Sequence, residues 1–170
     1  MKRTILKRRW EFKTSEQVNY SRINGYLSCM EVLNNGPGHL CLYELSPVAL
    51  NGNRRESLIA HLNKITHLDI SDNMCSWDWE VRLVKADNPV EKLSAVIDQF
   101  FFGQQHSPTL VDSKYKTHFL DVLMEEMNYV PIKFYEAISS TDETWHEIWW
   151  NDYLIDAGGE LFHLHFGATN

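Results

Sequence analysis

Two runs of alternating apolar and polar residues, 144–156 and 160–168, make up the end of the chain. Alternation with a period of two is the pattern of a β-strand with one face buried. Gly158-Gly159 separates the two runs, and a glycine pair in this position is a strong signal for a two-residue hairpin turn. The sequence therefore predicts a C-terminal β-hairpin in which Ala157 pairs with Glu160.

This register sorts the hairpin side chains onto two faces. The apolar face must belong to the core, and it carries Trp149, Tyr153, Ile155, Phe162, Leu164 and Phe166. The opposite face is polar and aromatic together, and it carries His146, Trp150, Asp152, His163 and His165. Because side chains alternate along a strand, a slip of one residue would exchange the two faces.

Apolar residues at helical spacing predict several helices before the hairpin. The helices are expected over residues 14–34, 54–67, 89–102 and 112–128. Asn53 and Asn88 precede two of these segments and can act as N-caps, because a short amide side chain accepts a hydrogen bond from the first turn. In the last helix we expect Tyr115 and Phe119 to face inward.

Shorter alternating stretches predict the remaining strands, at residues 4–13, 39–45, 77–85 and 129–138. We expect Pro47 to stop the second of these, since proline cannot donate to the hydrogen-bond ladder. Strands and helices mix without strict alternation, which favours an α+β fold with an antiparallel or mixed sheet of about five or six strands and three or four helices. The length, 170 residues, fits a single globular domain over residues 1–170.

Composition narrows the class of protein. Hydrophobic residues make up 44% of the chain and charged residues 23%, as in an ordinary globular protein. The densest apolar run, 96–102, is too short to span a membrane. Cys29, Cys41 and Cys75 are scattered without a C-x-x-C pair, which favours reduced thiols. We therefore expect a cytoplasmic protein that does not bind a membrane.

Charge is distributed unevenly along the chain. The net charge is -7, yet residues 1–22 hold seven bases and two acids, whereas residues 121–170 hold ten acids and one base. An acidic block repels nucleic-acid phosphate and attracts a basic partner, which speeds association. An acidic surface also serves plain solubility, so the charge alone does not require a partner.

The basic segment 1–13 is expected to form an edge strand or arm. Positive charge on an edge strand prevents edge-to-edge aggregation, and such an arm could also dock on the chain's own acidic half. Arg8, Arg9 and Trp10 combine cationic and aromatic groups, a mixture that single-stranded nucleic acids favour. The acidic excess of the rest of the chain argues against that function, and we expect no nucleic-acid partner.

The sequence contains no G-x-S-x-G, H-E-x-x-H or glycine-rich phosphate loop, so we expect neither an enzyme nor a cofactor. The exception is His163-x-His165 with Asp152 across the hairpin, where two imidazoles and a carboxylate could form a three-ligand metal site. A metal held there could activate water, so a small metal-assisted hydrolase is the alternative function. The same residues could equally form an ordinary cross-strand polar group.

Tryptophan and carboxylate residues crowd together before the hairpin turn. We expect the partner-binding residues to be Glu143, Trp145, Glu147, Trp150, Asp152 and Asp156. Exposed tryptophan ringed by acids is the composition of a binding hot spot for a cationic protein. If helices covered both faces of the sheet, the same indoles would be buried instead.

A small, acidic, cysteine-poor and tryptophan-rich α+β domain without catalytic motifs resembles the immunity proteins that bacteria pair with polymorphic toxins, such as those of contact-dependent growth inhibition systems. The resemblance is one of type, spread over the whole chain. It implies a protein that binds a basic toxin domain, such as a nuclease, and neutralises it by occluding its active site. The basic segment 1–13 departs from a uniformly acidic inhibitor and leaves the position of the interface open.

Overall fold

The computed structural model describes residues 20–69, 80–102, 114–139 and 149–169. The elements in chain order are α1 (Tyr20–Asn34), β1 (Leu40–Val48), α2 (Arg54–Asp69), β2 (Val81–Lys85), α3 (Pro89–Phe101), α4 (Lys114–Glu126), β3 (Ile132–Ser139), β4 (Trp149–Ala157) and β5 (Glu160–Thr169). The strand expected at residues 4–13 lies outside the described residues. No helix in the described part of the chain is long and apolar enough to cross a membrane.

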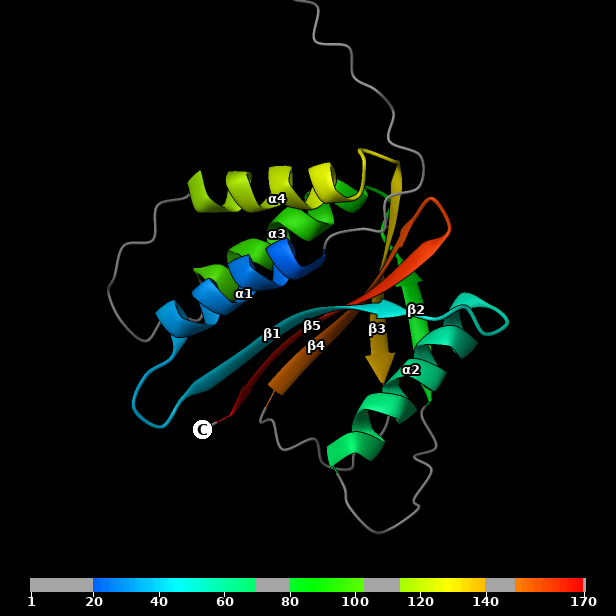
Figure 1. Ribbon diagram of the computed structural model, residues 1–170, viewed down its shortest axis with the longest axis horizontal. Helices are drawn as coiled ribbons and strands as arrows, with labels where there is room; N and C mark the ends of the chain where they lie inside the picture. Colours follow the sequence, from blue (N-terminus) through cyan, green and yellow to red (C-terminus); the bar gives the residue numbers. More distant parts are fainter. Residues whose placement is uncertain (1–19, 70–79, 103–113, 140–148, 170) are drawn as a thin grey trace, which may run out of the picture.

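The five strands form one antiparallel sheet in the order β1-β5-β4-β3-β2. Figure 1 shows α1, α3 and α4 together on one face of this sheet and α2 on the opposite face. The α+β fold class is therefore confirmed, and so is the C-terminal hairpin of β4 and β5. The hairpin occupies the centre of the sheet, so both of its faces are positioned to be covered.

The hairpin has the expected register. Ala157 pairs with Glu160, and the ladder continues without a slip to Trp149 and Ala168. Gly158 and Gly159 have φ angles of 65° and 100°, a left-handed conformation that glycine adopts without the steric cost that a side chain imposes. The glycine pair thus explains both the tight turn and the pairing that follows from it.

The larger core lies between the sheet and helices α1, α3 and α4. The apolar hairpin face is buried there, together with the inward residues of the three helices. Aromatic rings fill its centre, where Phe100 stacks on Phe166 with 4.4 Å between ring centroids and Phe134 stacks on Tyr153 at 5.1 Å. Trp149, also expected in this core, has a side chain outside the described residues.

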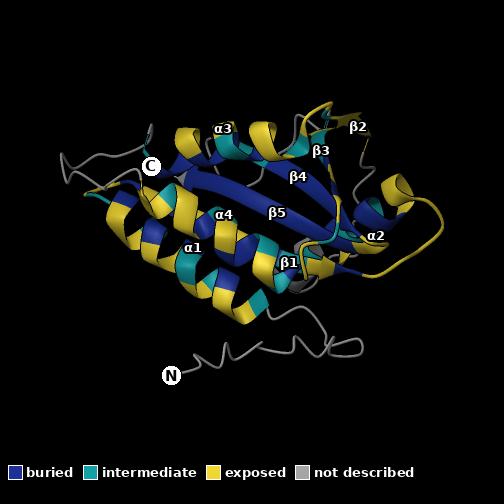
Figure 2. Ribbon diagram, turned by 90° about the horizontal axis from the view of Figure 1, so that it is seen from above, coloured by how far each residue is buried: buried dark blue, intermediate teal, exposed yellow. Residues whose placement is uncertain are grey.

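A smaller core lies on the opposite face, beneath α2. It consists of Val48, Leu58, Leu62, Val81, Leu154 and Leu161. Figure 2 shows most of β4 and β5 buried, although Trp150 and Asn151 are only partly buried and Glu160 is exposed. Because of this second core, polar side chains on that face of the hairpin are more buried than a sheet covered on one side only would leave them.

Three local expectations were wrong. Strand β1 does not stop at Pro47 but continues to Val48, because β1 is an edge strand of the described sheet and an edge strand needs hydrogen bonds on one side only. Tyr115 is 42% exposed, because it lies in the first turn of α4 rather than along its buried stripe. Tyr129 does not belong to β3, since its φ of 53° places it in the turn after α4.

Candidate functional site

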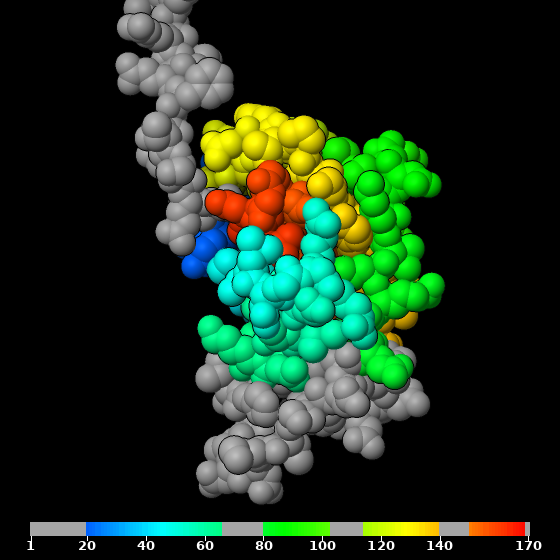
Figure 3. Space-filling model, turned by 90° about the vertical axis from the view of Figure 1, so that its right-hand side faces the viewer, coloured from blue at the N-terminus to red at the C-terminus, as the bar shows by residue number. Residues whose placement is uncertain are grey.

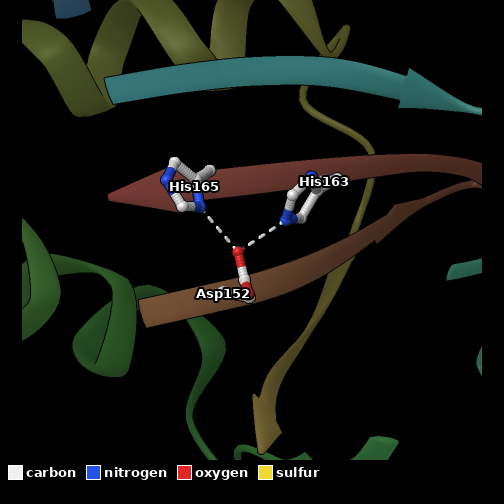
Figure 4. A group of neighbouring side chains, drawn as sticks. All are labelled: Asp152, His163 and His165. Carbon is white, nitrogen blue, oxygen red and sulfur yellow. Dashed lines mark hydrogen bonds and ion pairs between the residues drawn. The ribbon is translucent and has the colours of Figure 1, made fainter. Parts of the chain in front are cut away.

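Asp152, His163 and His165 meet on the face of the hairpin that packs toward α2. His163 Nε2 lies 2.8 Å from Asp152 Oδ1, and His165 Nδ1 lies 2.7 Å from the same oxygen. Figure 4 shows the three side chains pointing toward one another from β4 and β5. One ligand atom from each residue lies within 4.8 Å of the others. The register predicted from the glycine pair therefore produces this cluster, which we call the Asp-His-His cluster.

The cluster is buried rather than exposed. The exposed fractions are 4% for Asp152, 2% for His163 and 8% for His165. The contact of Asp152 with a protein partner therefore stays a prediction, one that its burial does not favour. A carboxylate buried in this way interacts with groups of its own molecule, here the two imidazoles.

The two imidazoles keep the Asp152 carboxylate ionised. Burial alone would raise the pKa of this carboxyl, because a charge is poorly solvated in the interior. Hydrogen bonds from His163 and His165 favour the charged form more strongly, and the net effect is a pKa well below the ordinary range. The cluster therefore contains a negative charge at neutral pH.

His61 of α2 joins the cluster from above the sheet. Its ring lies 5.2 Å from the ring of His163 in an edge-on contact, and its Nε2 atom lies 3.0 Å from Ser46 Oγ of β1. Burial is the main reason that the pKa of His61 falls from 6.5 to about 4, and nearby positive charge adds to the effect. His61 is thus neutral at pH 7.

Sequence reasoning missed His61 although a signal was present. His61 follows Leu58 by three residues and precedes Leu62 by one, so it lies on the apolar stripe of α2. A histidine on the inward stripe of a helix is a candidate for a buried polar contact. Its partner could not be named, because the pairing of Ser46 with His163 depends on where β1 joins the sheet.

Asp156 is a second buried carboxylate with a structural role. Its Oδ2 atom accepts a hydrogen bond from Arg54 Nε at 2.7 Å and lies 3.6 Å from Lys133 Nζ, while Oδ1 accepts from the backbone N–H of Gly159 at 3.0 Å. Burial raises the pKa of Asp156, but the Arg54 hydrogen bond and the other contacts outweigh it and hold the pKa below its ordinary value. Asp156 ties the hairpin turn to α2, and its expected role in partner binding also stays a prediction that its burial does not favour.

Figure 3 shows the end of the hairpin at the surface, between α4 in yellow and the segment around the start of α2 in cyan. Glu160 is exposed in this turn. Of the remaining residues expected to bind a partner, only Trp150 is described, near the other end of the hairpin. Trp150 is half-buried, and Glu143, Trp145 and Glu147 lie outside the described residues.

Trp150 belongs to an apolar surface at that end of the sheet. It lies opposite Gly167 of β5, and Gly167 lies opposite Leu42 of β1 on its other side. Leu40 and Leu42 project from the same face and are 61% and 51% exposed. We call Leu40, Leu42, Gly167 and Trp150 the apolar sheet surface. Glu44, two residues further along β1, is exposed beside it.

A cavity of about 450 Å³ lies beside β3 and β4. Its lining consists of Glu136, Ala137, Ile138, Ser139, Trp150, Asn151 and Asp152. It therefore borders both Trp150 of the apolar sheet surface and Asp152 of the Asp-His-His cluster.

Part of the acidic C-terminal half is neutralised within the molecule. Arg22 Nη1 lies 2.9 Å from Glu125 Oε2 and 3.0 Å from Glu126 Oε1. Arg22 belongs to α1, and the segment 1–13, for which docking on the acidic half was expected, lies outside the described residues.

Fold and site together define an α+β protein with a buried Asp-His-His cluster and an apolar sheet surface. No protein-family model matches the sequence, and no curated protein matches it. A solved structure similar to this fold is the crystal structure of citrus MAF1, with a TM-score of 0.47 and 9% sequence identity, covering 88% of this chain and 98% of that chain. A likeness of this size carries no argument about function.

Proposed function

We propose that this protein is an inhibitor of the immunity type, which binds a basic toxin domain and neutralises it by occluding its active site. The observation that supports this proposal is the apolar sheet surface. Large apolar side chains that are exposed and adjacent to one another are typical of protein-binding surfaces, whereas isolated ones are not. Leu40 and Leu42 are such residues, and Trp150 lies on the same rung as Leu42.

Negative charge next to this surface supports a basic partner. Glu44 is exposed beside Leu42, and Asp142, Glu143 and Glu147 precede Trp150 in the sequence. Carboxylates at the rim of an interface raise the association rate of a cationic protein, while buried apolar contacts set the dissociation rate.

The first test replaces Leu42 with arginine. Leu42→Arg places a bulky cation on the apolar sheet surface, so we expect the affinity for the toxin domain to fall at least about tenfold, mainly through faster dissociation. The partner to test is a basic toxin domain encoded immediately upstream of this protein. Binding kinetics and inhibition of the toxin at equimolar inhibitor provide the measurement.

Leu50→Arg is the matched control. Leu50 is 70% exposed in the segment after β1, outside the apolar sheet surface, and its replacement changes the net charge by the same amount. Its affinity should stay within about twofold of the unmodified protein. Equal binding by the two variants would exclude the apolar sheet surface as the interface, and no binding by the unmodified protein would exclude the inhibitor function.

Charge reversal tests the electrostatic part of the proposal. Glu143→Lys and Glu147→Lys should each slow association with the toxin domain several-fold at low salt and much less at high salt, because screening weakens attraction between exposed charges. Glu160→Lys makes the same change at the opposite end of the hairpin and should have the smaller effect. An association rate that responds neither to these substitutions nor to salt would contradict electrostatic steering.

A further inference from the structure

We propose that Asp152, His163 and His165 form a binding site for a divalent transition-metal ion such as Zn²⁺. The site lies on the sheet face beneath α2, apart from the exposed leucines of the apolar sheet surface. It therefore goes beyond the inhibitor function, and either proposal can fail without the other. The donor set is two imidazole nitrogens and one carboxylate oxygen, which suits zinc and other first-row transition metals.

The geometry of the cluster is close to that of three metal ligands. Both histidine nitrogens are directed at the same oxygen of Asp152, at 2.7 and 2.8 Å. With bonds of about 2.1 Å, two ligands of a tetrahedral zinc ion lie about 3.4 Å apart. Each imidazole nitrogen would therefore need to move about 0.6–0.7 Å away from the Asp152 oxygen to admit a cation, and the two nitrogens, which lie within 4.8 Å of each other, would settle at the same spacing.

Charge also favours a cation. An ionised carboxylate in the interior is costly unless an opposite charge compensates it. Within the described residues no lysine or arginine pairs with Asp152, whose ion-pair contacts are the two histidines. This distinguishes Asp152 from Asp156, which has Arg54 and Lys133 as partners. When the two imidazoles are neutral they bring no compensating charge, and a divalent cation bound by them and by Asp152 would supply it.

The surroundings fit a metal site in two further respects. His61 packs edge-on against His163 and lies within hydrogen-bond distance of Ser46, so it can hold the His163 ring in place. The cavity that borders Asp152 offers a route of entry for an ion and, if a coordination position stays open, for a water molecule.

The experiment uses the full chain, purified without chelator and then titrated with Zn²⁺ and with Co²⁺. We expect one equivalent of metal to bind and Co²⁺ to give a visible absorption band. In the nuclear magnetic resonance spectrum, Zn²⁺ should shift the imidazole signals of His61, His163 and His165 and leave that of His118, which is exposed on α4. Unchanged signals for His163 and His165 at about tenfold excess of Zn²⁺ would overturn the proposal.

Asp152→Asn separates a metal site from an ordinary hydrogen-bonded group. Asparagine has nearly the same shape, and its carbonyl oxygen can still accept hydrogen bonds from both imidazoles, but it lacks the charge. We expect metal affinity to fall at least about 100-fold, since loss of groups that merely support a ligand already costs 10–100-fold. His118→Gln is the control and should bind within about twofold of the unmodified protein.

The outcomes also separate the two proposals. If Asp152→Asn binds metal as tightly as the unmodified protein, the metal site is wrong, whatever the toxin assay shows. If the unmodified protein binds one equivalent of Zn²⁺ through His163 and His165 but no toxin domain, the metal site stands and the inhibitor function fails. Metal titration of the unmodified protein keeps the test decisive even if Asp152→Asn does not fold.

Discussion

Phe166→Ala is expected to lower the free energy of unfolding by about 3–5 kcal/mol. Phe166 is fully buried in β5, where its ring stacks on Phe100 of α3 and meets the rings of Tyr43 and Tyr153 edge-on. Removing it leaves a cavity between the sheet and α3 that rigid aromatic neighbours cannot fill. Urea unfolding followed by circular dichroism measures the change.

Phe102→Ala is the control for this prediction. Phe102 follows α3 and is only half-buried, so the same truncation removes less contact and leaves space that water can enter. We expect a loss below about 1.5 kcal/mol. Similar losses for the two variants would mean that the stacked rings of Phe100 and Phe166 do not form the centre of the core.

The hairpin could be predicted in detail because its signals are local. Gly158-Gly159 and the alternation on either side fix both the turn and the register, and the register alone places Asp152 opposite His165. The Asp-His-His cluster could be predicted because its three residues lie close together in the sequence. The N-caps could be predicted for the same reason. Asn53, which precedes α2, accepts a hydrogen bond from the Glu56 N–H at 3.0 Å, as expected for an asparagine cap.

Burial of the polar hairpin face could not be predicted, because alternation reveals which side chains share a face but not what covers it. Trp150 and Asp152 share a face by parity, yet α2 and the neighbouring strands bury Asp152 while Trp150 is only half-buried. Whether a face is covered depends on where a separate helix docks, which is a non-local property. Two of the residues expected to bind a partner, Asp152 and Asp156, are therefore buried.

The apolar sheet surface depends on another non-local pairing. Leu42 precedes Trp150 by more than half the chain, and the two share a rung only because β1 joins the hairpin at β5. The same pairing brings Ser46 beside His163 and so provides the partner of His61. Strand order depends on the packing of the whole molecule. The spacing of residues along the sequence therefore could not predict these contacts.

Acid is expected to destabilise the metal-free protein through His61. The pKa of His61 is about 4 in the folded protein, against 6.5 for an ordinary histidine. Between these values the unfolded chain binds a proton that the folded protein does not, so stability is full above about pH 6.5 and is lost as the pH falls toward 4. The shift corresponds to about 3 kcal/mol for a fully buried ring, and because His61 keeps some exposure we expect about 1–2 kcal/mol.

His61→Phe should remove this pH dependence, because phenylalanine fills the same space without titrating. The free energy of unfolding, measured in urea with a chelator present, should then change little between pH 6.5 and pH 4, while His118→Phe retains the full slope. Asp152 and Asp156 do not interfere in this window, since their lowered pKa values make their contributions disappear only below about pH 4. An unchanged slope in His61→Phe would show that the pKa of His61 is not lowered in the folded protein and that another group causes the pH dependence.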